Sequence, residues 1–203
     1  EETCTGDPAR RLGNEYLFQM QAETNIGTFK QYDVKKIITT CPHCFNTMKN
    51  EYPQLGGNYD VIHYTAFVGE LLKQGKLRPN EAGIGSIGTV TYHDSCYLGR
   101  HNGEFGAPRE IISSISGLDF VEMDQNQERA FCCGAGGGRM WMEEEPDQRV
   151  SVLRAKEAIE TGAETVAVGC PFCLTMMTDG VKSCGSEAKV EDVAENLAKR
   201  LGL

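Results

Sequence analysis

The chain repeats itself at a distance of 129 residues, and this repeat restricts its possible folds more than any other feature. Shifting the sequence by 129 positions aligns identical residues without a gap: Cys4 with Cys133, Arg10 with Arg139, Glu15 with Glu144, Cys41 with Cys170, Pro42 with Pro171, Cys44 with Cys173, Met48 with Met177 and Val61 with Val190. Two long segments would rarely keep one register by chance, so we infer two copies of one unit. We assign residues 1–75 to a first copy that lacks its N-terminal part, and residues 76–203 to a complete second copy.

Hydrophobic periodicity predicts alternating helices and strands in both copies. In the first copy we expect a helix over about 9–30, a strand over 34–40, a helix opening at Cys41-Pro42, a strand over 60–64 and a helix marked by Phe67, Leu71 and Leu72. Residues 75–88 form a linker. The second copy should contain strands over 89–93, 119–123 and 165–169, helices over about 108–116 and 147–161, a helix opening at Cys170-Pro171, and a last helix marked by Val193, Leu197 and Leu201.

This alternation is typical of parallel βαβ units. The predicted fold class is therefore α/β, with two pseudo-repeated βαβ-type halves, parallel sheets, and cysteines at the C-terminal edges of the strands. Ligands of parallel α/β sheets bind where strands end and helices begin. Cys41, Cys96 and Cys170 all follow predicted strands, and a helix N-terminus favours the thiolate form that binds metal.

Charge and cysteine content exclude several classes of protein. The 203 residues carry 20 Lys and Arg against 29 Asp and Glu, and a net charge of −9 argues against a nucleic-acid partner. No apolar run is long enough to span a membrane, and no signal peptide is recognisable. The abrupt start at Glu1 leads us to expect a fragment of a longer protein. Nine cysteines without a secretory signal favour metal or redox chemistry in a reducing compartment, which predicts a cytoplasmic location.

Three kinds of site could use these cysteines. A structural zinc site is disfavoured because 125 residues separate Cys44 from Cys170, whereas a zinc ribbon has about 15–20 between its pairs. A thiol–disulfide oxidoreductase could use the two Cys-Pro-x-Cys pairs, but this hypothesis leaves several clustered cysteines unexplained. An iron–sulfur cluster accounts for thiolates from separated segments and for the glycine-rich loop at 134–138, whose backbone amides could approach cluster sulfides.

The second copy has a specific cysteine spacing. Cys96 is followed after 35 residues by Cys132-Cys133-Gly134, and after 36 more by Cys170-Pro171-Phe172-Cys173. This pattern resembles the cysteine-rich CCG domain of heterodisulfide reductase and of related succinate, fumarate, glycolate and lactate oxidoreductases. The resemblance implies an iron–sulfur cluster, [4Fe–4S] or non-cubane, held by Cys96, Cys132, Cys133, Cys170 and Cys173. It leaves a partial second site at Cys4, Cys41 and Cys44, because Thr3 stands where the second copy has Cys132.

Longer strings indicate a narrower group within this family. The segments 4–11, 40–47, 92–100 and 132–141 resemble the C-terminal region of bacterial membrane-associated iron–sulfur oxidoreductases linked to electron-transfer flavoprotein and menaquinone. This resemblance implies an electron-transfer module of a respiratory or anaerobic oxidoreductase. Its redox partner would be a flavoprotein, its acceptor quinone through a membrane segment absent from this sequence, and its location the cytoplasmic face of the membrane. The alternative is the thiol–disulfide oxidoreductase.

Residues around the cysteines suggest supporting roles. His93 and Asp94 could relay protons or, equally, cap the strand end and orient the ligand loop. His43 could donate a hydrogen bond to sulfur, and Arg100 and Arg139 could offset the negative charge of a cluster. We expect residues 140–142 to be ordinary core and Cys184 to be a free thiol outside the site.

Overall fold

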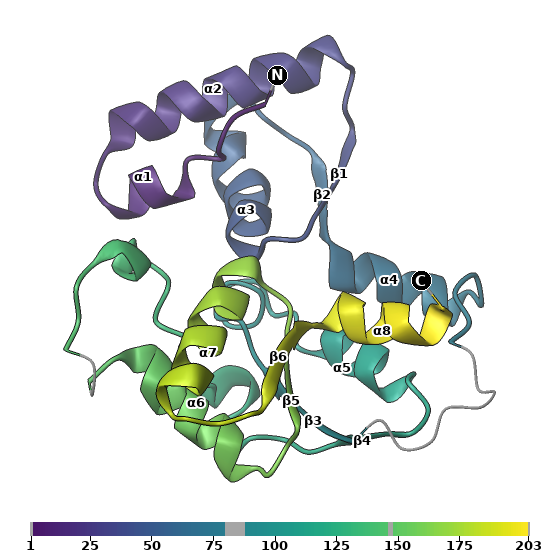
Figure 1. Cartoon of the computed structure of the whole chain (residues 1–203). Helices are drawn as coiled ribbons and strands as arrows, with labels where there is room; N and C mark the ends of the chain where they lie inside the picture. Colours follow the sequence, from purple (N-terminus) through teal and green to yellow (C-terminus); the bar gives the residue numbers. More distant parts are fainter. Residues whose placement is uncertain (1, 80–87, 146–147, 203) are drawn as a thin grey trace.

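The computed structural model describes residues 2–79, 88–145 and 148–202, and it has an α/β fold with two parallel sheets (Figure 1). The first sheet has the order β1–β2, and the second has the order β4–β3–β5–β6. The strands are β1 (Lys36–Thr39), β2 (Asp60–His63), β3 (Gly88–His93), β4 (Leu118–Phe120), β5 (Thr165–Val168) and β6 (Lys189–Asp192). Every strand pair is parallel, so the predicted fold class is confirmed.

The strand registers reproduce the sequence repeat. Lys36 pairs with Asp60 in the first sheet, and Thr165 pairs with Lys189 in the second, so both partners are displaced by the same 129 positions. The helices that follow these strands also correspond: α3 (Pro42–Asn46) with α7 (Pro171–Ser183), and α4 (Tyr64–Lys73) with α8 (Val193–Leu201). The division of the chain between residues 75 and 76 stays a prediction, because most of the expected linker lies outside the described residues.

Several element boundaries differ from the prediction. The helix expected over 9–30 is two helices, α1 (Asp7–Arg11) and α2 (Glu15–Gln31). Gly13, with a φ of 83°, turns the chain between them, and the Asn14 side chain accepts a hydrogen bond from Leu17 N to cap α2. The other predicted helices are α5 (Gly106–Ser113) and α6 (Val150–Glu160); residue 147, the expected start of the latter, lies outside the described part.

Each sheet contributes to a separate part of the core. In the second sheet Val90, Val166 and Val168 are fully buried. In the first half the core is formed by α2 against the turns after α3, with Phe18 and Ile26 buried. The prediction that residues 140–142 are ordinary core is correct only for Met140, which packs against the core of the second half. Trp141 is 59% exposed and Met142 is 53% exposed, and Trp141 lies on a short turn (Arg139–Trp141) with its ring against Phe172.

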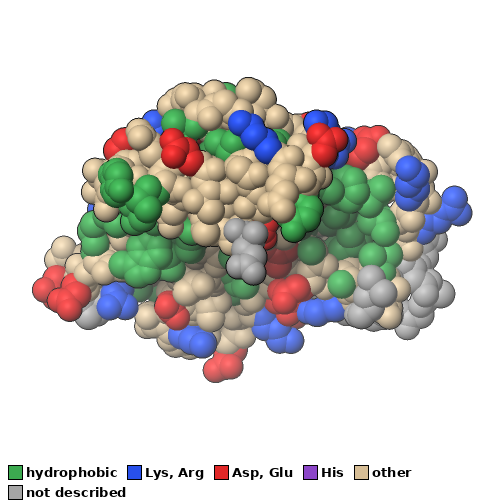
Figure 2. Space-filling view, turned by 90° about the horizontal axis from the view of Figure 1, so that it is seen from above, with side chains coloured by type: hydrophobic (Ala, Val, Ile, Leu, Met, Phe, Trp, Pro, Cys, Tyr) green, Lys and Arg blue, Asp and Glu red, His purple; other side chains and the backbone are tan. Residues whose placement is uncertain are grey.

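The two halves meet along three helices. α4 of the first half packs against α5 of the second, and α5 packs against α8 (Figure 1). The Tyr64 hydroxyl at the start of α4 donates a hydrogen bond of 2.6 Å to Asp192 Oδ1 at the end of β6. This arrangement brings the ends of both sheets toward each other. The face seen in Figure 2 carries exposed hydrophobic side chains in more than one place, with scattered acidic and basic groups and no continuous basic patch.

Candidate iron–sulfur site

Three cysteines lie at strand-to-helix junctions. Cys41 follows β1 and is the N-cap of α3, and Cys170 follows β5 and is the N-cap of α7. A proline stands at the next position in both helices, where its missing N–H leaves no backbone donor unpaired. Cys96 lies in the loop directly after β3, the strand that pairs with β5. Because these strands are parallel, Cys96 and Cys170 leave the second sheet at the same edge.

The five second-copy cysteines predicted as ligands form one row of thiols. Neighbouring side chains shift one another's pKa in the order Cys96, Cys132, Cys133, Cys173 and Cys170. The Cys173 and Cys133 sulfurs are 3.3 Å apart. Cys133, Cys170 and Cys173 are at most 3% exposed, so water has little access to this end of the row. The structure thus brings all five together at one sheet edge.

Near the outer end of this row, Cys132 follows Cys96 and has a lowered pKa. Hydrogen bonds from Cys133 and Cys96 lower the pKa of Cys132 well below that of a free cysteine. The backbone N–H of Gly134 donates a further hydrogen bond to its sulfur at 3.3 Å. Hydrogen bonding to Cys132, together with burial, raises the pKa of Cys96 and of Cys133. The pKa values of neighbouring thiols are thus shifted in opposite directions.

Cys170 is the last thiol of the row, at its inner end, and its pKa is lowered as that of Cys132 is. Hydrogen bonds from Cys173 and from Cys41 lower its pKa, and backbone N–H groups at the start of α7 contribute in the same direction. The Cys173 pKa is raised, because Cys173 hydrogen-bonds Cys133 and Cys170 and is fully buried. Thiolate is the form that binds iron, so the lowered pKa values of Cys132 and Cys170 favour the ligand form of these two side chains.

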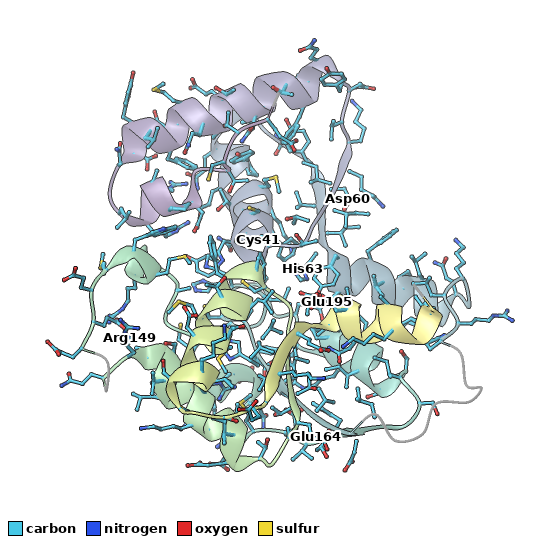
Figure 3. The ribbon with its side chains drawn as sticks, viewed as in Figure 1. Cys41, Asp60, His63, Arg149, Glu164 and Glu195 are labelled. Atoms are coloured by element: carbon cyan, nitrogen blue, oxygen red, sulfur yellow. The ribbon has the colours of Figure 1, made fainter. Side chains whose placement is uncertain are left out.

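The first-copy cysteines adjoin this row only in part. Cys41, labelled in Figure 3, affects the pKa of both Cys44 and Cys170, so the equivalent junctions of the two copies lie close together. His43 lies between them, with Nδ1 3.9 Å from the Cys41 sulfur and 4.0 Å from the Cys170 sulfur. The hydrogen bond with Cys41, together with burial, raises the pKa of Cys44. His43 is thus placed to contact sulfurs of both copies, as the sequence suggested.

Cys4 is separate from the row of thiols. It is exposed, and together with Cys44 it lines a pocket of about 320 Å³ that also contains Thr5, Asn25 and Met48. The Thr5 hydroxyl donates a hydrogen bond to the Cys44 sulfur at 3.4 Å. Cys184, which we predicted to lie outside the site, ends α7 and directs its thiol toward the Val152 carbonyl oxygen.

Two side chains beside the thiols have contacts that the sequence did not reveal. His93 ends β3 and is 1% exposed, and its Nδ1 accepts a hydrogen bond of 3.0 Å from Nε of Arg154, which is fully buried on α6. A ring nitrogen of His93 and the sulfurs of Cys133 and Cys173 all lie within 4.8 Å of one another. Arg139 pairs with Glu144 at the surface, and its charge also acts on Cys132, as that of Arg100 acts on Cys96. Arg154 adds a buried cation near the thiols.

Asp94 is held by an arginine and a backbone amide. Its carboxylate accepts two hydrogen bonds of 2.8 Å from Arg109 and another from the Gln127 backbone N–H at 2.7 Å. It is 4% exposed. These contacts connect the loop after β3 with the loop before Cys132; the choice between the two predicted roles, proton relay and orientation of the ligand loop, stays a prediction.

Buried donors around the thiols fit an anionic cluster. Among the described residues, His93 Nε2, Ser95 Oγ and Arg154 Nη2 are buried and have no hydrogen-bond partner. Buried donors are almost always paired, because an unpaired one loses its hydration without compensation. All three belong to residues in the thiol region or in direct contact with it. A group rich in sulfur and negative charge at this position would accept hydrogen bonds from them.

The fold and the site define a cysteine-rich α/β domain of the kind that holds iron–sulfur clusters. Residues 1–49 and 90–178 match the family described as the cysteine-rich domain, CCG. The chain belongs to this family, as its cysteine spacing predicted.

Several curated proteins are similar to the chain over nearly its whole length. It is 47% identical to EtfAB:quinone oxidoreductase of Syntrophomonas wolfei and 49% identical to a probable iron-sulfur-binding oxidoreductase, FadF, of Bacillus subtilis, covering 99% and 98% of this chain. It is 39% identical, over 100% of this chain, to one of the polypeptides of the dihydromethanophenazine:CoB–CoM heterodisulfide reductase of Methanosarcina barkeri. The chain spans 29%, 28% and 50% of the length of these three relatives.

These relatives confirm the predicted class, an iron–sulfur module of an oxidoreductase. They also support an iron–sulfur cluster as the cofactor. A similar protein from Chromohalobacter salexigens is called a probable membrane-anchored ferredoxin. Among the described residues of this chain, no helix combines the length and the hydrophobicity that a membrane crossing requires.

Proposed function

We propose that the second copy holds a cluster, [4Fe–4S] or non-cubane, through Cys96, Cys132, Cys133, Cys170 and Cys173, and that the chain carries electrons inside a larger oxidoreductase. The observation that supports this most strongly is the continuous row of five thiols, with lowered pKa values at Cys132 and Cys170. When bound, the cluster supplies one-electron chemistry. The protein's residues hold it, exclude water from its inner end and set its electrostatic surroundings.

The first copy provides a route for electrons to or from this cluster. Cys41 and Cys44, with Cys4 as the third predicted ligand, would form a partial site whose nearest thiol hydrogen-bonds Cys170. His43 bridges the two copies at 3.9 and 4.0 Å from their sulfurs. A group bound at the first copy would therefore lie next to the second-copy cluster, and electrons could pass between them at this junction.

We assign the donor and the acceptor from the relatives' names. EtfAB:quinone oxidoreductase connects an electron-transfer flavoprotein to quinone by name, and the chain is 47% identical to it. We propose that this chain receives electrons from a flavoprotein and passes them toward quinone at the cytoplasmic face of a membrane. The chain has 29 acidic and 20 basic residues, and its net negative charge favours a partner with a basic docking surface.

The proposal is tested by iron and sulfide analysis on the full-length protein purified without oxygen. We expect bound iron and sulfide, broad absorption near 400 nm and an EPR signal on reduction. Cys133→Ser together with Cys170→Ser should remove most of the second-copy iron, while the control Cys184→Ser leaves the content unchanged. Colourless wild-type protein without iron, or equal content in the double variant and the control, would overturn the proposal.

The thiol–disulfide alternative is opposed by burial. Attack on a disulfide requires an accessible thiolate, but Cys170 and Cys173 are at most 1% exposed. The more accessible pair, Cys41 and Cys44, has a raised pKa at Cys44. A dithiol enzyme would be colourless and would reduce a disulfide substrate without iron, so the absorption measurement separates the two functions.

A further inference from the structure

The side chains of His93 and Arg154 form a buried pair next to the proposed cluster site. His93 lies at the end of β3, and Arg154 lies in the middle of α6; both are at most 1% exposed. Arg154 Nε donates a hydrogen bond of 3.0 Å to His93 Nδ1. Arg154 Nη1 donates to the Gln125 carbonyl oxygen at 2.9 Å and to the Glu157 carboxylate. Arg154 Nη2 and His93 Nε2 have no partner among the described residues.

This hydrogen bond determines which nitrogen of His93 carries the proton. A guanidinium is always a donor, so His93 Nδ1 must be the acceptor and cannot carry a hydrogen. In the neutral imidazole the proton then resides on Nε2, which makes Nε2 a donor. A protonated ring nitrogen has no free lone pair for a metal. His93 can therefore donate to sulfur, but it is not set up to bind iron.

The position of the ring directs this donor toward sulfur. With Nδ1 engaged by Arg154, Nε2 is the nitrogen left for the sulfurs of Cys133 and Cys173, which lie within 4.8 Å of the ring. Both cysteines are predicted ligands at the most buried part of the row. A donor to ligand or cluster sulfur stabilises the reduced state, because reduction adds negative charge to the sulfurs.

We propose that Arg154 and His93 act as a positioning pair that raises the reduction potential of the second-copy cluster: Arg154 fixes the His93 tautomer and contributes a buried positive charge, and His93 donates an Nε2–H hydrogen bond to cluster or ligand sulfur. The inference rests on the proposed function. In the step it affects, the cluster gains one electron, and no proton moves at His93. Arg154 acts strongly because water does not screen a charge in the interior as it screens one at the surface.

The first copy has no equivalent of this pair. The position matching Arg154 is Asn25, which is buried and hydrogen-bonds the carbonyl oxygens of Thr3 and Cys4 and the Tyr52 hydroxyl. A neutral amide therefore occupies the place of a cation. The pair belongs to the second-copy site alone, so its removal should change one cluster signal selectively.

The test is a redox titration of full-length protein followed by EPR, with iron and sulfide content measured on every variant. His93→Phe removes the donor, and Arg154→Gln removes the charge. We expect each to lower the equilibrium constant for one-electron reduction at least tenfold, a shift of about 59 mV to lower potential, at unchanged iron content. His93→Gln, which keeps an N–H donor, should have a reduction potential close to that of the wild type. Arg78→Gln, which removes an exposed arginine that donates a hydrogen bond to the Gly75 carbonyl oxygen, is the matched control and should have no effect.

Pulsed EPR with ¹⁵N-labelled histidine keeps the proposal falsifiable if a His93 or Arg154 variant does not fold. Because His43 Nδ1 also lies 4.0 Å from the Cys170 sulfur, the measurement is made on the wild type and on His43→Phe, which has the residue of the equivalent second-copy position, Phe172. We expect a weak coupling to one histidine nitrogen, as a hydrogen bond through sulfur produces, that persists in His43→Phe. A strong coupling that persists there would identify His93 as an iron ligand, and loss of the coupling in His43→Phe would exclude the His93 contact; either result overturns the inference. An unchanged potential in loaded His93→Phe also overturns it. Absence of iron from the wild type would instead refute the proposed function itself.

Discussion

The two copies place equivalent cysteines at different depths. Cys170 and Cys173 of the second copy are at most 1% exposed, whereas their first-copy equivalents Cys41 and Cys44 are half-buried. Cys133 is buried, and its equivalent Cys4 is exposed. Both copies nevertheless share strand register and the Cys-Pro start of a helix. The same local scaffold thus produces two different sites.

The difference follows from what covers each strand end. In the second sheet β5 pairs with β6 on one side and with β3 on the other. The loop after β3 then brings Cys96 over the end of β5, and Asp94 ties this loop to Arg109. Within the described residues, β1 of the first sheet pairs with β2. The second-copy cysteines are therefore enclosed by a strand and a loop that precede them in the chain.

The largest expected effect of this difference is on iron content. Replacing Cys133 and Cys170 by Ser should remove most of the bound iron, because it deletes two of five converging ligands. Replacing Cys4 and Cys41 should remove less, because Cys4 lies outside the row of thiols. Iron and sulfide analysis of the two double variants measures how much iron each one loses relative to the wild type. Equal losses from both would contradict the asymmetry between the copies.

The ion pair beneath the second site should matter more for stability than an exposed pair in the first. Asp94→Ala leaves Arg109, whose side chain is 14% exposed, with Glu122 as its remaining carboxylate partner. Breaking a buried ion pair by removing one partner is strongly destabilising, and we expect a loss of about 3 kcal/mol. Asp60→Ala, which breaks the exposed pair with Lys36, should cost less than about 1 kcal/mol. Denaturant unfolding of both variants tests this; similar losses would show that the Asp94 network has no special structural role.

Local sequence signals were sufficient for the junctions that carry the cysteines. A β-branched strand followed by Cys-Pro predicts the end of β1 and the start of α3, and the structure has both within two residues. Strand β6 was missed because Lys189, Glu191 and Asp192 leave it one apolar residue. The repeat contained the missing information, since β6 lies 129 residues after β2.

Buried charge was harder to predict. From the local sequence, Arg154 would be expected to be a solvated arginine on a helix. Only its small neighbours, Ser151, Ala155 and Ala158, indicate that this side of the helix is buried. Its partner His93 comes from a strand 61 residues earlier, so the contact depends on tertiary packing. Trp141 shows the opposite error, because a large aromatic residue suggested core and is exposed. Hydrophobic patterns do not identify such exceptions.

A buried histidine should make the first half sensitive to acid. Burial lowers the pKa of His63 to about 4, and Thr40 O accepts a hydrogen bond from its Nε2. The unfolded chain, with a histidine pKa of about 6.5, binds the proton more readily, so stability is lost as pH falls from about 6.5 to 4 and then levels off. The full loss is about 3 kcal/mol.

The control for this effect is His63→Asn, which keeps a good N-cap for α4. Unfolding free energies measured between pH 7 and pH 4 should fall more steeply for the wild type than for His63→Asn. Parallel pH profiles would show that His63 contributes no such linkage.

Replacing two helical glycines by alanine should change stability only modestly, and in opposite directions. A Cβ at Gly180 on α7 would lie 2.5 Å from the Ser151 carbonyl oxygen of α6, so Gly180→Ala forces these packed helices apart and should cost about 1–3 kcal/mol. Gly27 on α2 of the first half has open space at the same point, and Gly27→Ala should stabilise by about 0.5–1 kcal/mol through helix propensity. Thermal unfolding of the two variants gives both signs in one experiment. A stable Gly180→Ala protein would mean that α6 and α7 tolerate separation, and the close packing behind the second-copy thiols would not be what keeps that site deep.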